Sequence, residues 1–274
     1  MGTVAMASAA TAEEPKSADE IMTLVAINQD RGQRERSAFV YRQNIVIRLR
    51  DSHNKLLREE ISDYQVMPAE ERTNKELVNF TGRYHKGKEM VSYGKDEKLN
   101  DGGLGQADAQ LARELRDDLI SDKKSKDGLS PELFPLTAKE QVKYRFTLKG
   151  EETYQGTSVY RIAFEPKPKV ENDSAWKGEA LISKAEFQPM LVTTKLAHGI
   201  PLLVRTALGT NFQGLGFSVE YRKFDDGVWF PVSYGTEFRF KVLFFYSRQI
   251  TVSMANSDFR RADVKSSVEF ETTR

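Results

Sequence analysis

Residues 225–242, DDGVWFPVSYGTEFRFKV, contain the most regular alternation of apolar and polar side chains in the chain. From Val232 onward, the apolar face of this stretch comprises Val232, Tyr234, Thr236, Phe238, Phe240 and Val242. The residues between them are Ser233, Gly235, Glu237, Arg239 and Lys241. A period of two places successive side chains on opposite faces of a strand, so the pattern predicts a long strand that follows a turn. One of its faces is apolar and the other faces water.

Strand-like patterns recur along most of the chain. They occupy residues 38–50, 56–67, 76–84, 89–93, 141–150, 158–166, 175–183, 190–197, 217–224, 248–256 and 266–271. Together with the opening stretch they predict a sheet of about ten or eleven strands, because not every short pattern forms a strand. Most of them follow one another without an intervening helix, which predicts antiparallel meanders. Residues 199–209 fit either a short helix or an irregular strand.

Two segments have helical spacing. Ser17 and Glu20 form a capping-box pattern, and the apolar residues after them predict a helix of about three turns that ends near Gly32. Residues 106–124 carry leucines at i, i+4 spacing on an otherwise charged surface. We expect this second helix to lie outside the sheet or along its mouth, within a helical insertion at about residues 95–137.

The helices cannot cover the predicted sheet. A helix is about 10 Å wide and strands lie about 4.8 Å apart, so one helix covers roughly two strands. Exposing the apolar row of residues 232–242 would forgo on the order of 10 kcal/mol, which approaches the stability of a whole domain. The sheet is therefore expected to curl into an unclosed β-barrel, or half-barrel, wrapped over two helices. Its interior is either filled by side chains or left as an apolar cavity.

Composition narrows the classes of function. The 274 residues contain 41 Lys plus Arg against 40 Asp plus Glu, so the net charge of +1 indicates neither nucleic acid nor an anionic membrane as a partner. No cysteine is present, which excludes disulfides and thiolate metal sites. The three histidines, His53, His85 and His198, lack metal-ligand spacing, and no apolar run is long enough to span a bilayer. We expect no cofactor, no metal and no catalytic residue.

The first residues resemble the end of an export signal. MGTVAMASAATA contains three small-x-small patterns typical of signal-peptide cleavage regions, without the basic and apolar regions that precede them. We interpret residues 1–16 as a disordered leader remnant, and the protein as exported to the periplasm with its signal peptide removed. An alanine-rich disordered terminus without a targeting history is the alternative. Residues 17–274 are expected to form a single domain.

Three stretches carry a family resemblance. Residues 144–168, 176–192 and 221–240 resemble the superfamily of bacterial outer-membrane lipoprotein-sorting carriers, the LolA/LolB-like fold. Their most recognisable parts are Trp176-x-Gly178 and Asp226-Gly227-x-Trp229-Phe230-Pro231. The resemblance implies an unclosed barrel over helices, a periplasmic location and a hydrophobic cavity that accepts lipid. The sequence departs from anchored members because it has no lipobox cysteine.

The predicted ligand-binding residues lie on the apolar strand faces. They are Trp176, Tyr234, Phe238, Phe240 and Val242, although aromatic residues at strand spacing also commonly form a core. The leading hypothesis is a periplasmic, non-enzymatic carrier or binding protein that accepts a lipid or a lipoprotein acyl chain. The alternative is an envelope protein-interaction or sensor module with a filled barrel. A third possibility is a hydrolase of envelope glycans or lipids, which would require carboxylates that converge inside the cavity.

Overall fold

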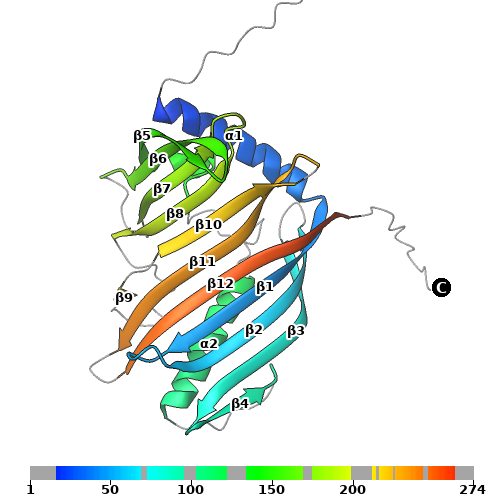
Figure 1. The fold of residues 1–274 in the computed structure, drawn as a ribbon, viewed down its shortest axis with the longest axis vertical. Helices are drawn as coiled ribbons and strands as arrows, with labels where there is room; N and C mark the ends of the chain where they lie inside the picture. The colour runs from blue at the N-terminus through cyan, green and yellow to red at the C-terminus, as the bar shows by residue number, and fades with distance from the viewer. Residues whose placement is uncertain are drawn as a thin grey trace, which may run out of the picture.

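The computed structural model describes residues 17–68, 73–95, 103–121, 134–168, 175–198, 212–213, 216–224, 226–242 and 246–262 (Figure 1). The described helices are α1 (Ala18–Arg36), α2 (Leu104–Ser121) and α3 (Ala138–Gln141). The strands before α2 are β1 (Phe39–Arg50), β2 (Leu56–Pro68), β3 (Thr73–Lys86) and β4 (Glu89–Tyr93). After α3 come β5 (Tyr144–Tyr154), β6 (Thr157–Pro166), β7 (Ala175–Ser183), β8 (Pro189–His198), β9 (Phe212–Gln213), β10 (Gly216–Lys223), β11 (Trp229–Val242) and β12 (Tyr246–Arg261).

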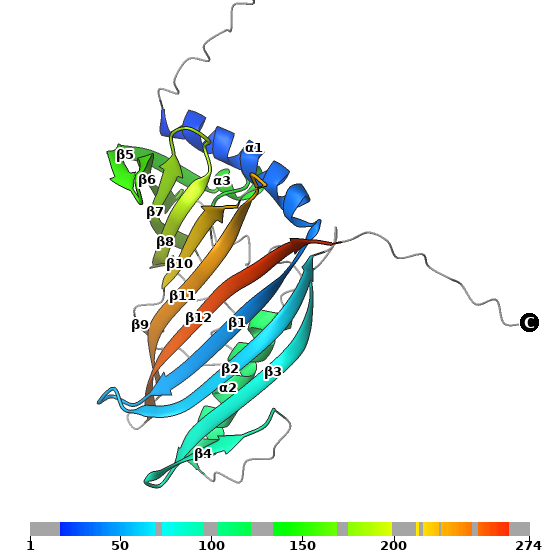
Figure 2. The same cartoon turned by 45° about the vertical axis from the view of Figure 1, so that its right-hand side comes forward.

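The strands form one curved, unclosed antiparallel sheet, which confirms the predicted fold class (Figures 1 and 2). Its order is β4-β3-β2-β1-β12-β11-β10-β8-β7-β6-β5, and β9 pairs with β11. The last strand, β12, returns between β11 and β1, so the two ends of the described chain pair in the middle of the sheet. The strand β9 was not predicted, because two residues carry no alternation. Residues 266–271 and 199–209 lie outside the described part of the chain.

The hairpin between β5 and β6 is tighter than predicted. The sequence placed a loop at residues 151–157, whereas β5 continues to Tyr154 and β6 begins at Thr157. The turn residues Gln155 and Gly156 both have positive φ, 48° and 78°. Two residues of this conformation match the twist of the flanking strands, which therefore pair up to the turn.

Helix α1 is longer than the sequence predicted. It has 19 residues and ends at Arg36, so the expected stop near Gly32 is wrong. The glycine gives the Arg36 side chain room, since a Cβ there would lie 2.9 Å from Arg36 Nη1. That Nη1 donates a hydrogen bond to the Trp229 carbonyl oxygen at 2.9 Å. This contact with β11 stabilises the last turn of α1, so the helix continues beyond Gly32.

The start of α1 is as the sequence predicted, and it allows a first test. Ser17 Oγ accepts from the Glu20 amide at 3.2 Å, and the Ser17 amide donates to Glu20 Oε2 at 2.9 Å. Ser17→Ala should lower the free energy of unfolding by about 1 kcal/mol, because it leaves a helix amide without its acceptor. Urea unfolding followed by circular dichroism measures the change, and an unaltered midpoint would contradict it. Ser92→Ala, at an exposed position of β4 where the hydroxyl has no hydrogen bond to another described residue, is the control for loss of a hydroxyl.

The alternation of β11 holds from Tyr234 to Phe238 but is interrupted at Val232. Glu220 pairs with Ser233 and Tyr221 with Pro231, which leaves Val232 as the extra residue of a β-bulge. The bulge reverses the phase of the strand, so Val232 is only half-buried and does not continue the predicted apolar row. A strand pattern read from sequence carries no sign of such an inserted residue.

Helix α2 lies against the concave face of β1 and β2, and not on the outside of the sheet, which was one of its two predicted positions (Figure 2). Its charged residues Asp108 and Arg116 face the sheet together with Leu111 and Ala112, and all four are buried. The charges are accommodated because the facing strands carry opposite charges. No helix of the described chain is both long and apolar enough to cross a membrane.

Candidate functional site

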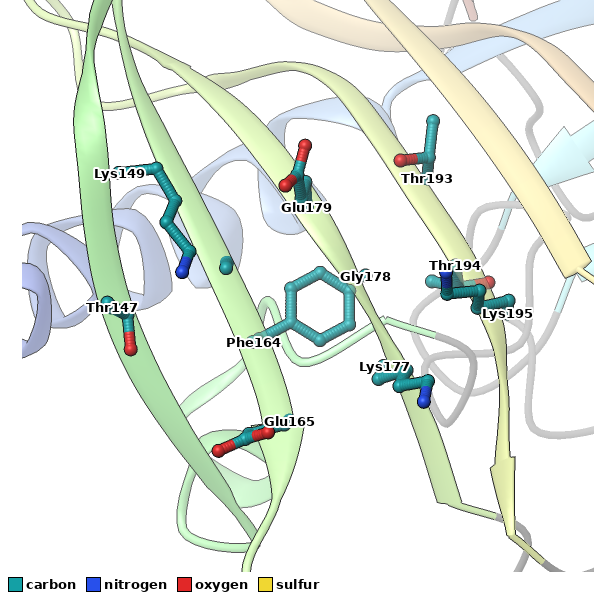
Figure 3. A pocket seen from close by; sticks show the side chains of 11 residues that line it. Thr147, Lys149, Phe164, Glu165, Lys177, Gly178, Glu179, Thr193, Thr194 and Lys195 are labelled. Atoms are coloured by element: carbon teal, nitrogen blue, oxygen red, sulfur yellow. The ribbon is translucent and has the colours of Figure 1, made fainter.

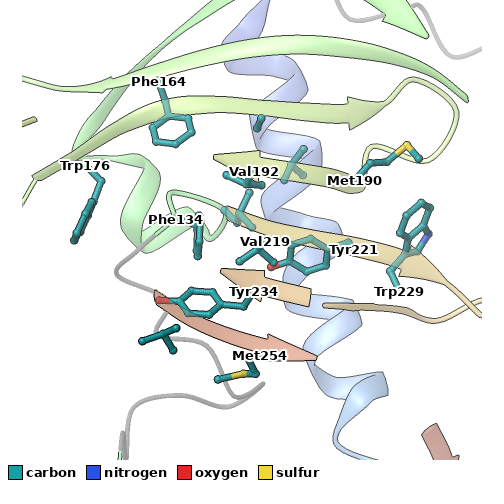
Figure 4. Close-up of a cluster of buried hydrophobic side chains, with 14 of the residues drawn as sticks. Phe134, Phe164, Trp176, Met190, Val192, Val219, Tyr221, Trp229, Tyr234 and Met254 are labelled. Atoms are coloured by element: carbon teal, nitrogen blue, oxygen red, sulfur yellow. The ribbon is translucent and has the colours of Figure 1, made fainter. Parts of the chain in front are cut away.

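An aromatic row crosses the concave face of the sheet. Trp176 of β7 meets Phe217 of β10 edge to face, with ring centroids 4.8 Å apart. The Phe217 ring in turn stacks on Tyr234 of β11 at 5.5 Å. Phe134, from the chain before α3, belongs to the same buried cluster (Figure 4). The row joins strands that are far apart in sequence into one apolar wall.

Three of the five predicted site residues are in this wall. Trp176, Tyr234 and Phe238 have exposed fractions of 3%, 5% and 5%, and they belong to one core cluster. Phe240 and Val242 extend along the same strand, but their side chains lie outside the described part of the structure. Their role as ligand-binding residues stays a prediction.

Two buried residues on this wall carry polar groups of interest, and the second of them has a buried atom without a hydrogen-bond partner among the described residues. Burial raises the pKa of Tyr234 well above its usual value, and no hydrogen bond joins its hydroxyl to another described side chain or backbone group. The second group is Gln43 of β1, which is fully buried; its Nε2 donates to Asn256 Oδ1 at 2.9 Å, while its Oε1 has no partner in the described structure. An unmatched buried polar atom costs about 1–3 kcal/mol, so Gln43 Oε1 is a place where a hydrogen-bond donor of a ligand would be stabilised.

Glycines set the curvature beside the aromatic row. A Cβ on Gly178 of β7 would overlap the carbonyl oxygen of Thr193, and one on Gly216 of β10 would overlap that of Thr194. The backbones of β7 and β10 thus approach β8 from its two sides more closely than any side chain allows. The Phe164 ring lies across from Gly178 and fills the space that the glycine leaves. At these two positions the absence of a side chain lets β7 and β10 come close to the backbone of β8.

The wall beneath α2 is polar. Arg248 Nε donates to Asp108 Oδ1 at 2.6 Å and its Nη2 to Oδ2 at 3.0 Å, while the Tyr246 hydroxyl donates to Oδ1 at 2.6 Å. Burial, together with the hydrogen bond to Asp108, raises the pKa of Tyr246 above its usual range. A planar guanidinium and a phenol thus hold one carboxylate in a fixed geometry.

A second buried ion pair lies further along α2. Arg116 Nη1 donates to Glu60 Oε2 at 2.7 Å, and the Tyr93 hydroxyl donates to Glu60 Oε1 at 2.7 Å. Burial, reinforced by the Glu60 charge, raises the pKa of Tyr93. Nearby, the Arg58 guanidinium lies over the rings of Tyr84 and Tyr93. The concave face therefore has an apolar part near α1 and a charged part under α2.

The sequence did not indicate this charged part. Asp108 and Arg116 lie two helical turns apart, on either side of Leu111 and Ala112. Helical spacing therefore predicts only that they lie next to the buried apolar side of α2. Charged residues in that position usually face water. Their partners come from β2 and β12, and only the folded sheet brings these together.

Glu59 and Glu60 do not form an acid–base pair of the kind a glycosidase uses. Glu59 and Glu60 are neighbours in β2 and therefore point to opposite faces. Glu59 binds Arg48 at 2.6 Å and Arg83 at 2.7 Å on the outer face, whereas Glu60 is held by Arg116. Burial raises the pKa of Glu59, but its hydrogen bonds to Arg48 and Arg83 outweigh burial and lower it overall. Within the described residues, no His, Asp and Glu side chains form a cluster that could hold a metal ion.

No family model and no curated protein matches the chain. Among solved structures it is similar to a DUF1329 family protein from Desulfovibrio piger, with 15% identity and a TM-score of 0.44 over 92% of this chain and 96% of that one. A LolA superfamily protein from Nitrosomonas europaea gives 12% identity and a TM-score of 0.37 over 91% and 96% of the two chains. A domain assigned to the outer-membrane lipoprotein-sorting proteins, from Vibrio parahaemolyticus, has 11% identity and a TM-score of 0.41 over 91% of this chain and 95% of that one. The chain itself forms a single unclosed antiparallel sheet with helices on its concave face, the architecture of a half-barrel.

Proposed function

We propose that the protein is a periplasmic, non-enzymatic carrier or binding protein whose half-barrel accepts a lipid or a lipoprotein acyl chain. The observation that carries the proposal is the aromatic row of Trp176, Phe217 and Tyr234 on a concave, unclosed sheet. Rings from neighbouring strands provide a continuous apolar surface along which an extended acyl chain can lie. Such contacts need no reaction chemistry, in keeping with the absence of a convergent carboxylate pair among the described residues.

The buried polar atoms of the wall indicate where a headgroup would bind. The Tyr234 hydroxyl can donate a hydrogen bond, and Gln43 Oε1 can accept one. Both lie on strands of the apolar wall, so a ligand with an apolar chain and a polar end would match them. Lipids and acylated peptides have this composition, and most other small metabolites do not.

Tryptophan fluorescence can report whether an acyl chain binds at the aromatic row, because one of the two tryptophans lies in the row and the other lies elsewhere. Trp176 belongs to the aromatic row, whereas Trp229 Nε1 donates to Glu186 Oε2 at 3.1 Å, beside α1 (Figure 4). Bromine atoms on an acyl chain quench tryptophan fluorescence on contact. With brominated stearic acid we expect saturable quenching of Trp176 by at least about half in Trp229→Phe, and little quenching in the matched Trp176→Phe.

Equal quenching of both variants would contradict binding at the aromatic row. Absence of quenching in both, with no lipid retained by the purified protein in native mass spectrometry, would remove the carrier proposal. Unbrominated stearic acid controls for changes in fluorescence that come from a conformational change alone.

A filled barrel that contacts another envelope protein is the second candidate. It is favoured by the burial of the wall itself: Ile250, Val252 and Met254 of β12 have exposed fractions of at most 3%. If side chains fill the interior completely, the outer surface and the loops are left for binding. Saturable uptake of an acyl chain by the purified protein would exclude this candidate.

A further inference from the structure

The outer face of β5, β6, β7 and β8 has a depression of about 540 Å³ that the proposed function does not use (Figure 3). Its charged rim is formed by Lys149, Lys177, Lys195, Glu165 and Glu179. These side chains alternate along their strands with buried residues of the core, such as Ile162, Ala180 and Val192. The depression therefore lies on the opposite side of the sheet from the aromatic row.

Small residues produce the hollow. Thr147, Ala163, Glu179 and Thr193 are directly paired across the four strands. Ala163, in the middle of the row, has a single methyl group, so the row is low there while long side chains rise around it. The hydroxyls of Thr147 and Thr193 lie beside this floor and can donate hydrogen bonds.

The charge on this face is unbalanced. Lys177 is paired directly with Lys195 across β7 and β8, an arrangement of like charges that destabilises a sheet. Lys149 stands on a β-bulge of β5. None of these three lysines forms an ion pair with another described residue, and each is exposed.

The carboxylates on this face are already matched by arginines. Arg161 Nη2 lies 2.7 Å from Glu179 and its Nη1 lies 3.8 Å from Glu152, while Arg145 lies 3.9 Å from Glu165. These five basic and three acidic residues give this part of the face a net charge of +2, and the three lysines are its basic residues without an acidic partner among the described residues. Asp and Glu elsewhere in the chain reduce the net charge to +1, which is why composition gave no sign of this patch.

We propose that this depression, with Lys149, Lys177 and Lys195 at its rim, docks the protein on an anionic lipid surface by binding headgroup phosphates. Charge complementarity indicates what binds here. The hollow is shallow and open, and its three flexible ammonium groups can each contact a different phosphate of a planar lipid surface, whereas a single bound ion would need an enclosed site. Each lysine close to an anionic surface strengthens binding by about fivefold at low salt. The inference goes beyond the proposed function and does not depend on whether the concave face binds lipid.

Sedimentation with vesicles tests the proposal on the full chain. We expect binding to phosphatidylcholine vesicles that contain phosphatidylglycerol, no binding to pure phosphatidylcholine, and release by high salt. K177Q/K195Q should lower the partition coefficient roughly twentyfold, because two ammonium groups are lost. K86Q/K88Q is the matched control: it makes the same charge change at the exposed β3–β4 turn, and its binding should fall by less than about threefold.

The folded state of the test variant is a second readout. K177Q/K195Q should melt at the same temperature as the parent or higher, because it removes two like charges that face each other. Failure to bind vesicles that contain phosphatidylglycerol would overturn the proposal. An equal loss of vesicle binding in K86Q/K88Q and K177Q/K195Q would also overturn it, because binding would then depend on the net charge of the protein and not on the depression. Displacement by inorganic phosphate at constant ionic strength would instead indicate a free-phosphate site and also overturn it. Quenching of Trp176 by brominated stearic acid should be unchanged in K177Q/K195Q, so the two proposals can fail separately.

Discussion

Asp108→Ala is expected to lower the free energy of unfolding by about 3–5 kcal/mol. The carboxylate of Asp108 accepts three hydrogen bonds, two from Arg248 and one from Tyr246, and all three side chains are at least nine-tenths buried. Its removal leaves a buried guanidinium without its counter-charge and a phenol without its acceptor. Urea unfolding, with circular dichroism and tryptophan fluorescence recorded on the same samples, measures the loss.

Two further variants show whether the loss of stability comes from the unpaired charge. Asp117→Ala makes the same substitution on the same helix at an exposed position, and should change stability by less than about 0.5 kcal/mol. Replacing Asp108 with Leu and Arg248 with Met together should recover a large part of the loss, because no unpaired charge remains. If the double replacement were as unstable as Asp108→Ala, packing rather than charge pairing would hold α2 against the sheet.

Gly178→Ala is expected to cost about 3 kcal/mol or more, although it adds a single methyl group. The new Cβ would overlap the Thr193 carbonyl oxygen, and it would lie 3.0 Å from the Phe164 ring. A backbone oxygen in a paired strand cannot move aside in the way that the end of a flexible side chain can. The variant must therefore separate β7 from β8 or flatten the bend of the sheet.

The control for this prediction is a glycine in the same sheet. A Cβ on Gly235 of β11 would lie 3.7 Å from Ser218 Oγ, an ordinary contact, so Gly235→Ala should be close to neutral or slightly stabilising. Thermal unfolding of both variants gives the comparison. Equal midpoints would show that the overlap at Gly178 relaxes freely, and that the curvature does not depend on this glycine.

The curvature also matters for the proposed function. Gly178 lies between Trp176 of the aromatic row and the depression on the outer face. If Gly178→Ala flattens the sheet, Trp176 and Phe217 should separate. Acyl-chain quenching of Trp176 should then weaken even at temperatures where the variant remains folded.

Most of the strands, their antiparallel arrangement and the unclosed sheet could be predicted from the sequence. A period of two is a local property, and each strand shows it wherever one face is buried, as Tyr234, Thr236 and Phe238 do. The capping box of Ser17 and Glu20 is equally local, and it begins α1 where predicted. Trp176, Tyr234 and Phe238 were predicted together because apolar strand faces of one curled sheet share an interior.

Features that depend on a partner distant in sequence could not be predicted and are seen in the folded chain alone. Arg36 reaches the Trp229 carbonyl and extends α1 past Gly32, and the bulge at Val232 arises from the pairing of β10 with β11. The charges of α2 are buried because β2 and β12 supply Glu60 and Arg248, which lie 188 residues apart in the chain. Lys177 and Lys195 likewise become neighbours through the pairing of β7 with β8. A sequence shows which side chains a segment carries, whereas strand pairing determines which charges and backbones each of them meets.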